Sequence, residues 1–229
     1  MLITILLIVI LIFSAIIHEY AHGWMAYRLG DETAKQAGRL TLNPIPHLDW
    51  IGSILLPFVL IISHSPFFIA WAKPVPYNPN NLRDKKFGDL KVAVAGPIIN
   101  LIMAFIFGLV IRFIYLGGTM KQDLIYGLLS GNTDGALALT SGSILASVVL
   151  LAVIICGVNL MLAFFNLIPI PPLDGSKVLM NLLPWSFRKY FYQLERYGFI
   201  LLLILLWSGA FNFIFSISLG IFSLLTGIQ

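Results

Sequence analysis

The sequence predicts an all-α membrane protein, a polytopic bundle of about four to five transmembrane helices. Of its 229 residues, 59% are hydrophobic and only 10% are charged, whereas soluble domains carry about 25% charged residues. Helices are expected because backbone polar groups in lipid must be satisfied within the segment, and the apolar runs lack the alternation of a membrane barrel. Four runs approach or exceed the roughly 20 apolar residues of a spanning helix: Met1–Ile17, Val92–Ile111, Ile144–Phe165 and Phe199–Leu225.

A fifth apolar run, Ile51–Ile62, is shorter. We expect this stretch, within residues 51–70, to re-enter the membrane or to lead into a short strand rather than to cross. If it does not cross, twelve of the 14 lysines and arginines, those in 28–39, 73–91 and 177–196, share one side of the membrane. Such an excess of positive charge is typical of the cytoplasmic side.

The remaining sequence is organised simply. We expect one domain over residues 1–229, with a core over 1–177 and C-terminal helices over 178–229. The stretch 117–142 mixes Gly, Ser, Thr and Asn with leucines and predicts a loop. A net charge of +4 is too small and too dispersed for a nucleic-acid surface, so no nucleic acid is expected as a partner.

The residues that carry chemistry begin at the end of the first run, in His18-Glu19-Tyr20-Ala21-His22. Positions i and i+4 of a helix share one face, so both imidazoles can bind one zinc ion. Glu19 can take the proton of a zinc-bound water, whose pKa falls to about 7. Such residues at the end of an apolar span are costly and therefore functional by default.

A third ligand is needed because a catalytic zinc usually takes three protein ligands and keeps a fourth position open. Asp174 follows the run Ile144–Phe165, after a proline-rich stretch whose prolines break the helix. We expect Gly175 to let the chain turn directly after the acid. A non-helical segment at membrane depth is tolerated where it lines a buried or wet cavity. Asp174 alone is equally compatible with a solvated helix end.

These motifs resemble the site-2 protease family of intramembrane zinc metallopeptidases. The resemblance rests on H-E-Y-A-H-G, on Asn166 to Gly175 as N-x-x-P-x-P-P-L-D-G, and on Ala95-Gly96-Pro97-Ile98-Ile99-Asn100 as the G-P-x-x-N signature. It covers Met1 to about Lys177 and is similar to a short bacterial branch without PDZ or CBS domains. It implies that His18, His22 and Asp174 bind zinc, that Glu19 is the general base, and that Asn166 and Asn100 support substrate binding near the active site.

The function that the resemblance implies is hydrolysis of peptide bonds in transmembrane or membrane-proximal segments of other membrane proteins. The enzyme would be a multi-pass protein of the cell membrane, in contact with the lipid bilayer, with its active site facing the cytoplasmic side. A divalent-metal transporter could use the same His and Asp cluster. A transporter, however, is expected to bind ions near the midplane and to show an internal repeat, and we find none.

Two further features each leave two interpretations. His47 and Asp49 form an H-x-D pair that could approach the metal, but Asp49 is also a good N-cap for the helix that follows. The segment Trp71–Pro76 contains an aromatic residue, a lysine and two prolines, which suits an exposed edge strand. In the family such an edge is thought to receive the unwound substrate by strand addition. An interfacial anchor formed by Trp71 and Lys73 explains the segment equally well.

Overall fold

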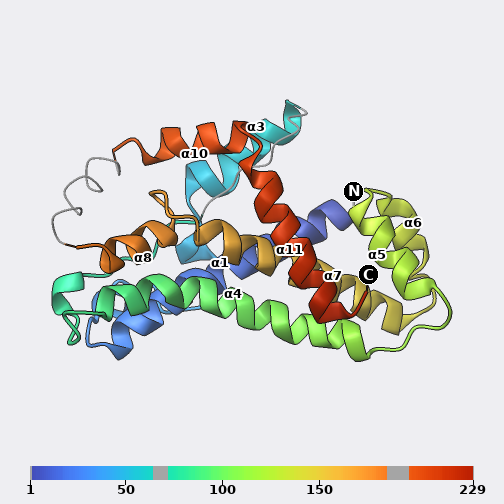
Figure 1. The fold of residues 1–229 in the computed structure, drawn as a ribbon, viewed down its shortest axis with the longest axis horizontal. Coiled ribbons are helices and arrows are strands. Elements are labelled where there is room, and N and C mark those ends of the chain that lie inside the picture. The colour runs from blue at the N-terminus through green and yellow to red at the C-terminus, as the bar shows by residue number, and fades with distance from the viewer. Residues whose placement is uncertain (1, 64–71, 185–195, 229) are drawn as a thin grey trace. The chain divides into compact units, whose positions relative to one another are not determined.

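The computed structural model describes residues 2–63, 72–184 and 196–228, and all regular elements within these ranges are helices (Figure 1). The prediction of an all-α membrane protein is confirmed. In chain order the elements are α1 (Leu2–Arg28), α2 (Thr33–Gln36), η1 (Ile45–His47), η2 (Trp50–Leu55), α3 (Leu56–Ile62), η3 (Pro79–Asn81), α4 (Gly88–Phe113), α5 (Met120–Leu129), α6 (Thr133–Ala138), α7 (Ile144–Asn166), α8 (Asp174–Leu182), α10 (Gly198–Trp207) and α11 (Ala210–Thr226).

Three of these helices, α1, α4 and α7, are long and apolar enough to cross a membrane. They contain 27, 26 and 23 residues, and each includes an 18-residue stretch whose mean hydropathy is 2.6, 2.4 and 2.8, respectively. At 1.5 Å per residue even the shortest is about 35 Å long, which exceeds the roughly 30 Å hydrocarbon core. These helices correspond to the first three predicted spans.

The fourth predicted span, Phe199–Leu225, is divided into α10 and α11. The break falls at Gly209, whose φ of +78° lies in the left-handed region. Glycine adopts this conformation without a steric penalty and commonly ends helices. The pattern of apolar residues gave no sign of the break, because hydropathy does not record backbone conformation.

One prediction about the connecting segments differs from the structure. The expected loop over 117–142 contains α5 and α6, where Leu124, Ile125 and Ala136 are buried. The Asn132 side chain caps α6 by accepting a hydrogen bond of 3.1 Å from the Gly135 amide. Polar residues in this stretch are typical of loops, but Asn132 shows that they also cap helices.

The stretch expected to re-enter the membrane begins with η2 and α3, which end at Ile62. Trp50 to Ile62 is about 20 Å long as a helix, too short to cross, and residues 64–71 lie outside the described part of the chain. Re-entry therefore stays a prediction. Trp71–Pro76 left an edge strand and an interfacial anchor as interpretations. Residues 72–78 form no strand in the part that the structure describes, which excludes Trp71.

The chain divides into two compact units, one formed by 1–11, 100–165 and 204–229, the other by 12–99 and 166–203. The first has an apolar core with small residues such as Ala104, Ala146 and Cys156, which let helices approach closely. Cys156 donates to the carbonyl of Ala104 at 3.3 Å and is a packing residue. The second unit contains His18, Glu19, His22 and Asp174. The single domain over 1–229 stays a prediction.

Candidate metal centre

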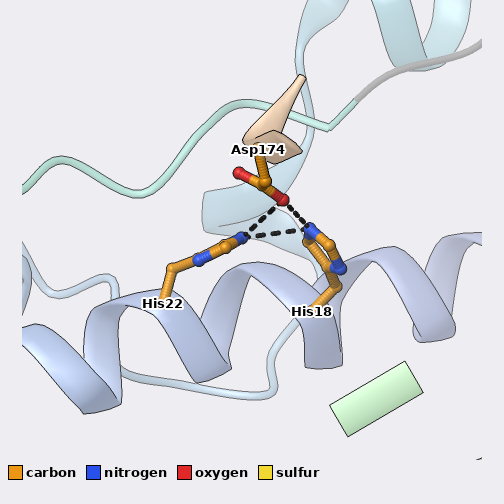
Figure 2. Close-up of side chains that lie close together, drawn as sticks. All are labelled: His18, His22 and Asp174. Atoms are coloured by element: carbon orange, nitrogen blue, oxygen red, sulfur yellow. Dashed lines mark hydrogen bonds and ion pairs between the residues drawn. The ribbon is translucent and has the colours of Figure 1, made fainter. Parts of the chain in front are cut away.

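Two neighbouring histidine side chains and one aspartate from a distant part of the sequence converge in the second unit (Figure 2). The Nε2 atoms of His18 and His22, both on α1, lie 3.0 Å apart. Oδ2 of Asp174, the first residue of α8, lies 3.0 Å from the first and 3.1 Å from the second. Both imidazoles are buried, and these three residues form the cluster of potential metal ligands within the described ranges.

With His22 neutral, hydrogen bonds alone do not satisfy this triangle of atoms. His22 Nδ1 lies 2.7 Å from the carbonyl oxygen of Val92, to which it must donate its proton. In the neutral ring, His22 Nε2 then carries a lone pair, which faces both the Asp174 carboxylate and His18 Nε2. A cation at the centre of the triangle removes this repulsion, and a carbonyl that fixes the tautomer is typical of a metal-binding histidine.

The triangle has the composition and dimensions of a zinc site. Two imidazole nitrogens and one carboxylate oxygen are a known set for catalytic zinc. Ligand atoms bound at 2.0–2.1 Å in a tetrahedron are about 3.3 Å apart, and the observed separations are 3.0 to 3.1 Å. The residues therefore fit a zinc ion with only small adjustments.

Gly96 on α4 keeps the space beside the two imidazoles open. A Cβ atom at this position would lie 2.4 Å from His22 Nε2 and 2.6 Å from His18 Nε2. Both are far below ordinary van der Waals contact, so any side chain would displace the atoms that face the metal. The sequence shows a glycine here, but only the fold shows what it makes room for.

The segment between α7 and α8 delivers Asp174. A Cβ on Gly175 would lie 2.2 Å from the carbonyl oxygen of Leu167, so the first turn of α8 packs directly on the backbone that follows α7. Gly175 was expected to permit a turn. Gly175 is not among the glycines with positive φ, so no special backbone angle requires it. Glycine is needed there because a side chain would collide with the backbone after α7.

Glu19 is half-buried, and its carboxylate accepts a 2.8 Å hydrogen bond from the Val75 amide. Val75 lies between Pro74 and Pro76, which have no N–H. Among these three residues, Val75 therefore has the single backbone donor. The segment is held further by the buried Arg39, whose Nη2 donates to the Lys73 carbonyl at 2.6 Å. Sequence reasoning missed this role, although the Pro-Val-Pro pattern that isolates one donor is visible in the chain.

The two expected supporting residues lie at different places. Asn100 is fully buried on α4 and donates to Oδ1 of Asn159 at 2.7 Å, an interhelical bond with α7. Asn166 is the last residue of α7 and is half-buried. A role for either in substrate binding stays a prediction.

His47 and Asp49 are not part of the cluster. Asp49 caps η2 by accepting hydrogen bonds from the amides of Ile51 and Gly52, at 3.1 and 2.7 Å. His47 is buried and donates through Nε2 to the Thr41 carbonyl at 2.8 Å. The capping interpretation of Asp49 is confirmed.

Known proteins are similar to this chain in sequence. The sequence profile of peptidase family M50 matches residues 78–208. A Bacillus subtilis protein named as the zinc metalloprotease YwhC is 38% identical over 201 residues, which are 87% of this chain and 78% of that protein. A Mycolicibacterium smegmatis protein named as the zinc metalloprotease Rip2 is 27% identical over 201 residues, 87% of this chain and 65% of the relative. A Methanocaldococcus jannaschii protein, also named as a zinc metalloprotease, is 27% identical over 164 residues, 72% of this chain and 63% of the relative.

No solved structure shows a significant match. The profile covers more than half of the chain, and the Bacillus subtilis relative is similar along most of its length. The chain therefore belongs to peptidase family M50, the site-2 protease family of zinc metallopeptidases whose motifs it carries.

Proposed function

We propose that this protein is an intramembrane zinc endopeptidase that hydrolyses peptide bonds in transmembrane or membrane-proximal segments of other membrane proteins. The observation that carries the proposal is the convergence of His18, His22 and Asp174 within 3.1 Å of one another. Family membership and the names of the relatives support zinc as the metal. The three spanning helices support a site in the membrane.

In this proposal, three residues bind the metal and a fourth transfers protons. His18, His22 and Asp174 would hold the ion, which when bound acidifies water and polarises a carbonyl. Glu19, next to the first ligand in sequence, accepts a proton from the attacking water and passes it to the leaving amine. The Val75 amide, 2.8 Å from Glu19 Oε2, orients the carboxylate for both transfers.

The physical state of the substrate limits the reaction. Peptide bonds inside a helix are internally hydrogen-bonded and crowded, so a transmembrane segment must unwind before a nucleophile reaches a carbonyl carbon. We therefore propose that substrates with helix-breaking residues near the scissile bond are preferred.

The active site faces the cytoplasm in this proposal. His22 lies near the C-terminal end of α1, whose last residue is Arg28. If the stretch that begins with η2 re-enters, the loops with twelve of the 14 basic residues lie on the side to which this end of α1 points. The positive-inside rule assigns such a side to the cytoplasm.

Glu19→Gln is the variant that tests the proposal. Purified protein in detergent is assayed for zinc content and for cleavage of a panel of single-span substrates. The glutamine keeps the shape of the side chain and leaves the three ligands in place, so we expect one zinc per chain and no cleavage. Near wild-type cleavage by zinc-loaded Glu19→Gln protein would refute the assignment.

A matched control separates the loss of the base from the loss of a charge. Glu32 is exposed before α2 and its side chain makes no capping hydrogen bond. Glu32→Gln therefore makes the same chemical change away from the centre. We expect wild-type zinc content and wild-type cleavage from this variant.

A further inference from the structure

One carboxylate in the second unit joins the helix that carries Asp174 to the segment that holds Glu19. Asp89, in the first turn of α4, accepts a 2.7 Å hydrogen bond from the Tyr77 hydroxyl through Oδ1. Its Oδ2 accepts a 2.8 Å hydrogen bond from Nδ2 of Asn181 on α8. No step in the mechanism above uses any of these three residues.

The Asn181 contact fixes α8 close to the metal ligand. Asn181 lies seven residues after Asp174, about two turns along the same face of the helix. The same Nδ2 group also donates to the Lys177 carbonyl at 2.9 Å, so its two hydrogens are directed to Asp89 and to the backbone of α8. A shift of α8 relative to α4 would break the contact with Asp89 and move Asp174 by a similar amount.

The Tyr77 contact fixes the segment that positions Glu19. Tyr77 follows two residues after Val75, whose amide donates to Glu19. Burial and the adjacent Asp89 carboxylate raise the pKa of the Tyr77 phenol, so the hydroxyl stays protonated and donates. The Lys177 ammonium lies 5.0 Å from the centroid of the same ring, which adds a second contact between α8 and this segment.

The face of α4 that begins with Asp89 carries the other supports of the centre. Val92, three residues on, accepts from His22 Nδ1, and Gly96, seven residues on, lies against the metal-facing atoms of both histidines. Positions i, i+3 and i+7 lie on one side of a helix. One side of α4 thus contacts elements that contribute each of the four central residues.

We infer that Asp89 is a positioning residue. Through Asn181 it holds α8 and Asp174 in place, and through Tyr77 it holds the segment around Val75, whose amide donates to Glu19. This inference rests on the proposed function. Residues that orient metal ligands from outside the coordination sphere typically contribute 10- to 100-fold to affinity or activity.

An exchange of donor and acceptor tests the contact. Asn181→Asp places two carboxylates opposite each other and should separate α8 from Asp89. Adding Asp89→Asn restores one donor and one acceptor: the new amide donates to residue 181 and still accepts from Tyr77. Asp89→Asn alone should have a smaller effect than Asn181→Asp, because the Asn181 amide can rotate and keep its contact with residue 89, although it then loses the hydrogen bond to the Lys177 carbonyl. Asn80→Asp, at an exposed position in η3, controls for the added charge.

The readouts are the zinc dissociation constant, by competition with a chelator, and the visible absorption spectrum of the cobalt-substituted protein, which reports ligand geometry. We expect Asn181→Asp to weaken zinc binding about 10-fold or more and to change the spectrum. The double variant should return both to near wild-type values. An unchanged spectrum and affinity in Asn181→Asp, or a double variant no better than the single one, would overturn the inference.

Tyr77→Phe keeps the inference testable if Asn181→Asp does not fold. It removes only the hydroxyl, so we expect a cleavage rate about 10-fold lower with an unchanged cobalt spectrum. Wild-type cleavage by this variant would count against Asp89. Failure of the proposed function is distinguishable, because then the wild-type protein itself would bind no zinc or cleave no substrate.

Discussion

Replacing Gly96 with alanine introduces one methyl group at the place where the two imidazoles face the metal. The new Cβ would lie 2.4 Å from His22 Nε2, 2.5 Å from His18 Cε1 and 2.6 Å from His18 Nε2. Ordinary contact requires about 3.4 Å, so these atoms must separate by about 0.8–1.0 Å. Zinc–ligand distances tolerate only about 0.2 Å, so the two histidines cannot both accommodate the methyl group and keep their bonds to the ion.

We therefore expect Gly96→Ala to weaken zinc binding by at least about 100-fold, equivalent to about 2.8 kcal/mol at 1.4 kcal/mol for each factor of ten. Overpacking of a close contact costs about 1–3 kcal/mol in folding free energy, and the better helix propensity of alanine recovers about 0.5–1 kcal/mol. The metal-free protein should consequently fold, with slightly lower stability.

The assay measures zinc per chain and its dissociation constant by chelator competition, together with thermal unfolding of the metal-free protein in detergent. Gly157→Ala on α7 is the matched control, because no atom lies within 4 Å of the Cβ that it would add. This control should bind zinc like the wild type. Wild-type zinc affinity in Gly96→Ala would refute the geometry of the centre as we describe it.

Other outcomes follow from the same proposals. His18→Ala combined with His22→Ala should remove stoichiometric zinc, and Asp174→Ala should weaken binding; undiminished zinc in the double variant would exclude these ligands. Chelation should abolish cleavage and added zinc should restore it. Substrate segments with helix-breaking residues should be cut faster than all-Leu variants, and equal rates would contradict the need for unwinding. Cysteines replacing Lys35 and Lys85 should be labelled from the same side of the membrane, whereas labelling from opposite sides would mean that the intervening stretch spans it.

The sequence alone determined the helical membrane fold and placed two of the three candidate metal ligands on one helix face. Transfer of a segment into lipid depends on the sum of its own residues, so the three long helices could be predicted from composition. The i, i+4 spacing of His18 and His22 is equally local, because helix geometry places both on one face whatever the rest of the chain does. The break at Gly209 was missed, since it depends on a backbone angle that apolar composition does not record.

The tertiary structure alone decided which distant groups meet these two histidines. The motif resemblance implied Asp174 as the third ligand and left Asp49 with two interpretations, and the chain path brings Asp174 to the imidazoles and uses Asp49 as a helix cap. The same path packs Gly96 against the two imidazoles and brings the Val75 amide to Glu19. Such contacts join residues tens to more than a hundred positions apart, and their geometry depends on how whole helices pack, which no local pattern of residues specifies.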